Sequence, residues 1–355
     1  MKKVLATIAM ASALAACNKT TVEYEQTGAI TFRPVAETPM GKAVTGPIST
    51  GYNQNESFKV YAWHKIDGLK GGEDWNAFFG DGTGVAKWID NGTFSSNGTG
   101  NQWAGSPTAY YWPKTGYLMF AGYSPADIVN TGALQGTASA TSAEYTIGTT
   151  PEFNITGFQQ GSWTSSDKSN MVDLMWFNIN DTDSKAVNNA TNGATIPVKF
   201  HHTLSWLTFK FETKETSAFF LTEAKLTKVN TKGDFKGSKT SAVWSMQSSP
   251  QDYILYGNET GTDLISAVTA DNILAVPFDF TNAQAGEYEI AIKFKQGGAD
   301  QLVQSVTLAL NTLNNKVWES GKHYTYTIKM SANPIILEPQ VDNWNNGNGG
   351  DININ

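Results

Sequence analysis

The sequence has little of several things on which many folds and functions depend. It contains a single cysteine, Cys17, so a disulfide within the chain is excluded and stability must come from packing. Only 16% of the residues are charged, and no convincing amphipathic helical pattern occurs. There is one arginine, Arg33, and acidic residues outnumber basic ones by 32 to 25. An acidic surface repels phosphates, so these scarcities disfavour nucleic-acid binding.

Long apolar runs are also lacking, and the one short run lies at the N-terminus. Lys2 and Lys3 precede the apolar stretch 4–14, which is too short for a permanent membrane span and is typical of an export signal. The small residues that follow end in Cys17, a pattern similar to a bacterial lipobox. In that interpretation Cys17 is acylated and becomes the mature N-terminus. The alternative is an ordinary signal with a chance cysteine.

Aromatic residues and glycines are plentiful, and they favour an all-β protein with many turns. Aromatics make up 12% of the chain, and there are 33 glycines. Residues 58–64 alternate with period two, as a strand with two unlike faces does. Residues 288–295 alternate more cleanly and predict a strand with one buried and one solvent-exposed face. The aromatic block 110–125 is divided by Pro113 and predicts a β-hairpin. Residues 126–170 are small and polar and predict an extended loop with marginal strands.

A domain boundary is expected near residue 195, after the polar segment 181–194. Beyond it, the apolar residues change parity between Trp206 and Leu207, which predicts a β-bulge inside one strand.

Candidate catalytic and cofactor sites do not emerge from the sequence. The four histidines have no metal-ligand spacing, and adjacent His201 and His202 point to opposite faces of a strand. No nucleotide, metalloprotease or serine-hydrolase motif occurs, so we expect no enzyme activity, no cofactor and no metal. The eleven tryptophans leave a glycan-binding surface lipoprotein open as an alternative, although Trp63 and Trp206 lie in alternating strands where burial is the default.

Several segments, taken in order, are similar to those of the fimbrillins, the lipoprotein pilins of type V fimbriae. They are the lipobox, Tyr111-Trp112-Pro113 followed by residues 120–125, Val172-Asp173-Leu174-Met175, residues 200–209, Thr231 to Phe235 followed by Trp244, and Tyr324 and Tyr326 leading to Trp344. Together they cover essentially the whole mature chain.

The resemblance implies two transthyretin-like antiparallel β-sandwich domains in tandem. The expected division is a signal peptide 1–16, a lipid-anchored N-terminal segment 17–42 with a removable strand, a first sandwich 43–195 and a second sandwich 196–355. The resemblance also implies anchoring in the outer membrane through lipid and later residence in a cell-surface fimbrium. The implied partners are other pilin subunits and a host or bacterial surface ligand, and the implied role is adhesion.

Polymerisation by strand exchange is implied as well. A sheet that loses a strand leaves a groove of unsatisfied backbone groups, and an extended segment of another subunit restores the contacts. The strand to be lost is expected within residues 22–32. The strand to be given is expected within residues 334–355, either around residues 334–344 or in the last residues. Candidate donor residues are Ile335, Ile336, Leu337, Val341 and Trp344.

The expected proteolytic site departs from a simple arginine cut. Arg33 is followed by Pro34, which disfavours trypsin-like cleavage, so the bond between Lys42 and Ala43 is the preferred site. An unprocessed anchor or tip subunit remains an alternative at this point.

Overall fold

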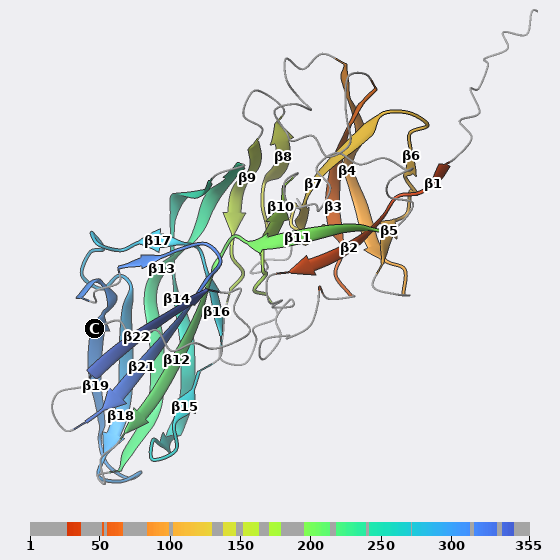
Figure 1. The fold of residues 1–355 in the computed structure, drawn as a ribbon. Coiled ribbons are helices and arrows are strands. Elements are labelled where there is room, and N and C mark those ends of the chain that lie inside the picture. Colours follow the sequence, from red (N-terminus) through yellow and green to blue (C-terminus); the bar gives the residue numbers. More distant parts are fainter. Residues whose placement is uncertain are drawn as a thin grey trace, which may run out of the picture.

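The structure is a computed structural model in which strands dominate the described part of the chain (Figure 1). One helical turn, η2 (Leu310–Thr312), is found among the described residues. The structure describes residues 27–36, 52, 55–66, 84–98, 102–129, 138–146, 152–162, 170–178, 195–213, 218–238, 241–270, 272–312, 316–331 and 336–343.

Seven strands form a closed barrel in the order β10-β11-β2-β5-β4-β3-β7, and pairing of β7 with β10 completes the ring. Alternate residues of its strands face inward and fill the barrel interior with apolar side chains, among which phenylalanine is the most frequent. A short pair, β1 with β6, lies beside it. The strands of this lobe are β1 (Thr27–Ala29), β2 (Thr31–Ala36), β3 (Phe58–Lys65), β4 (Val85–Ser96), β5 (Trp103–Gly105), β6 (Tyr111–Trp112), β7 (Tyr117–Ser124), β10 (Met175–Phe177) and β11 (Ile196–His202).

The second lobe is built on two sheets whose apolar faces share one core. The first sheet contains β12 (Ser205–Thr213), β15 (Val268–Thr269), β16 (Ile273–Ala275), β21 (Lys322–Met330) and, at its edge, β22 (Ile336–Asn343). The second contains β8 (Ser142–Thr146), β9 (Glu152–Gln159), β13 (Phe219–Ser238), β14 (Ala242–Asp263), β18 (Glu289–Gln296) and β19 (Val303–Ala309). A small pair joins β17 (Phe278–Asp279) to β20 (Val317–Trp318).

The chain passes between the lobes more than once. It leaves the barrel after β7, pairs β9 with β13 in the second lobe, and returns to the barrel with β10 and β11. The second lobe therefore contains strands from before residue 195, and the barrel contains β11 from after it. The division into two sandwich domains at that residue stays a prediction.

The alternating stretches predicted as strands are confirmed as strands at β3 and β18, although β3 is buried on both faces, and two other predictions are wrong. The strands on either side of Pro113 do not form a hairpin, because β6 pairs with β1 while β7 pairs with β3 and β10. The parity change beyond residue 195 is not a bulge. The register of β12 is regular, and the chain leaves the barrel after His202 and enters the other lobe at Ser205.

Residues 126–170 also differ from expectation, because they contain two well-formed strands, β8 and β9. Phe153 and Ile155 of β9 are fully buried, and they supply the apolar face that a strand in a packed sheet needs.

Candidate functional site

The segment around Ile30 lies in a sheet, as expected for a strand that fills a slot. β2 runs parallel to β11, with Phe32 opposite Ile196, and antiparallel to β5, with Phe32 opposite Trp103. The Ile30 amide donates to the Tyr110 carbonyl at 2.8 Å. Among the described strands, β2 is the one that joins β11 to β5, so the barrel ring depends on it (Figure 1).

The inward face of β2, together with Ile30 just before it, is deeply buried. Ile30 and Phe32 are fully buried and Pro34 is buried, whereas Arg33, which points the other way, is exposed. This alternation follows from the period of two along a strand. Burial of an apolar side chain of this size contributes about 1.5–3 kcal/mol.

Phe32 lies at the centre of an aromatic cluster. Its ring meets those of Phe94, Phe120 and Phe58 edge-on, at centroid distances of 4.9, 5.1 and 5.9 Å. Edge-to-face pairs of this kind add to the free energy gained from burial. Removal of β2 would therefore leave an aromatic-lined gap inside the barrel.

Tyr52 lies at the other side of this cluster, in the part of the chain that follows the expected cut. Its ring stacks on Phe200 at 5.1 Å and meets Trp103 at 5.4 Å. Its hydroxyl is 2.6 Å from the Ser124 hydroxyl. Burial raises the pKa of Tyr52 well above its usual value, so the phenol stays protonated and keeps its hydrogen bond with Ser124.

β11, the parallel neighbour of β2, is fixed at its end by buried polar contacts. His202 Nδ1 lies 2.8 Å from Asp173 Oδ2, and both side chains are buried. Thr203 donates both its amide, at 3.0 Å, and its hydroxyl, at 2.7 Å, to the Leu174 carbonyl. The edge of β11 that receives β2 is thus held by contacts that do not involve β2.

The C-terminal candidate strand is paired within its own chain. β22 is antiparallel to β21 from Ile336 opposite Lys329 to Asn343 opposite Lys322, and it forms an edge of its sheet. Val341 is half-buried against the second-lobe core. Of the predicted donor residues, the structure thus places Ile336, Leu337 and Val341 in β22.

Other predicted site residues fall outside the described ranges. They are the lipidation residue Cys17, the preferred cleavage pair Lys42 and Ala43, and the donor candidates Ile335 and Trp344. Arg33 is described, and it lies within a paired strand, opposite Pro197.

In the part of the chain that the structure describes, no three or more His, Cys, Asp or Glu side chains gather so that they could hold a metal ion. The histidines have structural contacts: His64 Nε2 lies 2.7 Å from the Thr115 carbonyl, and the His323 ring stacks on Trp206 at 3.7 Å.

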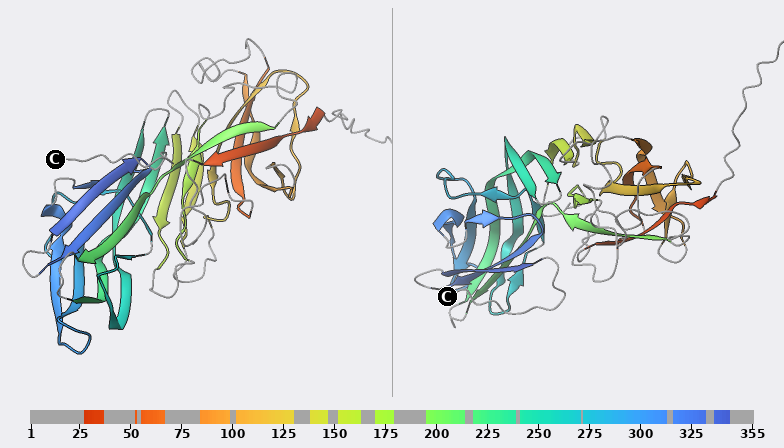
Figure 2. Two further views of the ribbon diagram at one scale, coloured as in Figure 1. Left: turned by 60° about the horizontal axis from the view of Figure 1, so that its bottom comes forward. Right: turned by 45° about the horizontal axis from the view of Figure 1, so that its top comes forward.

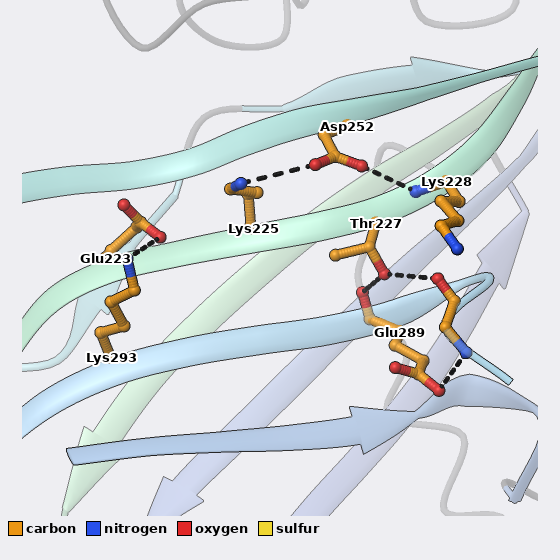
Figure 3. A network of polar contacts seen from close by, with 8 residues as sticks. Glu223, Lys225, Thr227, Lys228, Asp252, Glu289 and Lys293 are labelled. Carbon is orange, nitrogen blue, oxygen red and sulfur yellow. Dashed lines mark hydrogen bonds and ion pairs between the residues drawn. The ribbon is translucent and has the colours of Figure 1, made fainter.

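Figure 3 shows a polar network over β13, β14 and β18, where Lys293 pairs with Glu223 at 3.0 Å and Lys225 with Asp252 at 3.4 Å. These pairs are solvent-accessible, and such pairs contribute little to stability.

Within the described residues, no helix is long and apolar enough to cross a membrane.

A fimbrial protein of known structure has a similar fold, and two further structures match more distantly. A fimbrial protein from Bacteroides vulgatus ATCC 8482 matches with a TM-score of 0.55 at 16% identity, over 88% of this chain and 99% of that chain. A candidate cell adhesion protein from Bacteroides uniformis ATCC 8492 gives a TM-score of 0.49 at 15% identity, over 89% and 98%. The tip fimbrial protein Mfa3 from Porphyromonas gingivalis gives 0.36 at 14%, over 89% and 98%.

The family follows from the sequence match. A profile described as fimbrillin-like matches residues 43–344, so the chain belongs to the fimbrillin-like family. No curated protein matches it in sequence. Membership supports a role as a subunit of a cell-surface fimbrium that associates with other such subunits.

Proposed function

We propose that this chain is a pilin subunit that is exported as a lipoprotein, loses its N-terminal segment to a protease, and polymerises by strand exchange. The observation that carries the proposal is the position of β2, which completes the barrel between β11 and β5. Loss of β2 would leave both neighbours with unpaired backbone groups beside the aromatic gap. A buried backbone group without a partner costs about 1–3 kcal/mol, so the gap would favour a replacement strand.

The proposed cut lies between Lys42 and Ala43, and two observations argue against Arg33. Arg33 lies inside β2, paired to β11, and a protease must bind its substrate as an unpaired extended chain. Pro34 directly follows it. A cut after Lys42 also releases the whole of β1 and β2.

Acylation of Cys17 is proposed to hold the precursor at the outer membrane until this cut. Lipid chains anchor stably when two or more are attached, and each buried methylene contributes about 0.8 kcal/mol. Cleavage separates the anchor from the folded lobes and so couples release with opening of the barrel.

N-terminal sequencing of isolated fibres tests processing. We expect subunits that begin at Ala43, and we expect Lys42→Gln, but not Arg33→Gln, to prevent fibre formation. Both variants remove one positive charge from the same segment, which makes them a matched pair. Fibres whose subunits still begin at Cys17 would contradict the proposal and favour an unprocessed anchor or tip subunit.

Glycan capture has less support from the described side chains. The described tryptophans are buried, apart from half-buried Trp244 and Trp88, which is 37% exposed. Trp88 Nε1 donates to the Tyr111 carbonyl at 2.9 Å, so its position has a structural explanation.

A further inference from the structure

The strand proposed to be lost and one candidate donor have matching sequences. Residues 30–36 read Ile-Thr-Phe-Arg-Pro-Val-Ala, and residues 335–341 read Ile-Ile-Leu-Glu-Pro-Gln-Val. Both stretches place an apolar residue at every odd position of the heptapeptide, a charged residue at the fourth and proline at the fifth. A strand with this pattern presents one apolar face.

The matching positions lie next to buried residues in both places. Ile30, just before β2, and Phe32 and Pro34 within it are all buried. In β22, Val341 is half-buried against the second-lobe core. By register, positions 337, 339 and 341 of β22 lie opposite Ile328, Tyr326 and Tyr324 of β21, and all three of these β21 residues are buried.

The shared proline fits the geometry of both sites. β5 pairs with Thr31 and Phe32 but not with Pro34, so β2 has β11 alone as its paired neighbour at that level. β22 is an edge strand with β21 on one side. Proline lacks an amide hydrogen and is tolerated where one side of a strand is unpaired.

We propose that residues 335–341 of a second copy of this chain replace residues 30–36 in this one register, parallel to β11. Ile335 then takes the place of Ile30, Leu337 that of Phe32, Pro339 that of Pro34 and Val341 that of Ala36. This inference rests on the proposed strand exchange. The donor comes from another copy, because β2 and β22 of one chain lie in different lobes (Figure 2).

Neighbouring registers are physically worse. A slip of one residue turns the Glu338 carboxylate into the barrel. A two-residue slip one way places Pro339 at the position of Phe32, where β2 has paired neighbours on both sides and a missing amide is costly. The opposite slip places the Asn333 amide at the fully buried position of Ile30.

The alternative donor, residues 351–355, offers only Ile352 and Ile354 as apolar residues and has no proline. It therefore matches fewer positions of β2 than residues 335–341 do.

The register predicts which residues face each other across the subunit boundary. Val35 lies opposite Lys199 in the precursor, so Gln340 of the donor lies opposite Lys199 in the fibre. Neighbouring strands are about 4.8 Å apart, within the Cα separation that a disulfide spans. A slip of two residues increases this separation to about 8 Å, beyond that range.

Cysteine pairs test the register in isolated fibres. Processing removes Cys17, so the introduced residues are the only thiols in the fibre subunits. With Lys199→Cys and Gln340→Cys we expect mild oxidation to give a ladder of covalent multimers that reductant abolishes. Lys199→Cys with Glu338→Cys or with Asp342→Cys should give no ladder. As a control for the pair geometry, Val35→Cys with Lys199→Cys and Cys17→Ser should cross-link within the uncleaved precursor.

A disulfide that holds β22 in its own sheet provides a second test. Gln340 is opposite Thr325 in that sheet, so Thr325→Cys with Gln340→Cys should form a disulfide that keeps β22 from being donated. Polymerisation should then begin only after reductant is added.

Two results would overturn the register alone: a ladder from a slipped pair, or one from Thr195→Cys with Asn353→Cys, which would identify residues 351–355 as the donor. Fibres that retain β2, with subunits beginning at Cys17, would instead overturn strand exchange itself and the register with it.

Discussion

At the scale of single residues, Phe32 faces the inside of the barrel and its neighbour Arg33 faces the solvent. They are consecutive on β2, yet Phe32 is fully buried and Arg33 is exposed. We expect Phe32→Ala to lower the free energy of unfolding of the uncleaved precursor by about 3–5 kcal/mol, because a buried aromatic is replaced by a cavity. Arg33→Ala should change it by no more than about 0.5 kcal/mol. Urea unfolding of the two variants measures the difference.

The same pair tests whether β2 is present in the fibre. If processing removes β2, wild-type and Phe32→Ala fibres contain the same subunit and should dissociate at the same denaturant concentration. A lower concentration for Phe32→Ala fibres would mean that β2 stays in place after assembly.

His323 makes the second residue-scale prediction, which concerns pH. Its ring stacks on Trp206 at 3.7 Å, and its Nε2 donates to the Thr208 hydroxyl at 2.9 Å, since that hydroxyl donates to Asn272. Burial, with a further contribution from Lys210, lowers the pKa of His323 from 6.5 to about 4. Between these values the unfolded chain binds the proton and the folded chain does not. Stability should therefore fall as pH decreases from about 7 to about 4, by about 1–3 kcal/mol from this residue.

The contribution of His323 is isolated by comparison with His323→Gln, which keeps a donor but does not titrate. The unfolding free energy of the variant, measured at several pH values between 4 and 7, should depend less steeply on pH than that of the wild type. Parallel curves, or a His323 that titrates near 6.5 by NMR, would contradict the assignment.

At the scale of elements, β2 should act as a separable part. A synthetic peptide of residues 28–36 carries the whole inward face of the strand, so it should occupy the opened barrel of a processed subunit and slow fibre growth. A peptide with Phe32→Asp has the same length but would bury a carboxylate, and it should not inhibit. Light scattering of growing fibres compares the two. Equal inhibition by both peptides would indicate non-specific binding.

The predictability of the elements depended on how regular their side-chain pattern is. β18 alternates cleanly, with Ile290, Ile292 and Phe294 on one face, and it was predicted from the sequence alone. β9 alternates only as far as Ile155, and Gly157, at positive φ, interrupts the pattern. Its partner β13 lies far along the chain, and β8 pairs with β9, so the local pattern did not identify either strand.

The alternation of apolar residues showed which face of a strand is buried, but not with which strand it pairs. The change of phase after His202 reflects a passage from one sheet to another, and a bulge would produce the same pattern in the sequence. The candidate site was predictable to a similar extent. The apolar residues at both ends identified strands that could be lost or given, whereas the closure of the barrel by β2 depends on β5 and β11, whose pairing no local pattern reveals.

At the scale of the whole molecule, the two lobes share a core. Phe153 of β9 is stacked on barrel residues Tyr123 and Trp176, at centroid distances of 5.4 and 6.2 Å, and meets Phe235 of β13 at 6.3 Å. The rings of Trp63 in the barrel and Tyr145 in β8 also meet, with their centroids 5.2 Å apart. If the proposed cut removes β2, the opened barrel would therefore keep a face that β8 and β9 still support.

This shared core predicts that the uncleaved precursor unfolds as one unit. Phe153→Ala should lower the free energy of unfolding by about 3–5 kcal/mol, and hydrogen exchange should become faster by the same factor in β4 of the barrel and in β21 of the second lobe. Val303→Ala, at an exposed position of β19, is the control and should change little. If protection fell in one lobe only, the lobes would be independent. The remaining strands of an opened barrel would then have no support from the second lobe while they await a donor, and rapid capture of a neighbouring subunit would have to stabilise them instead.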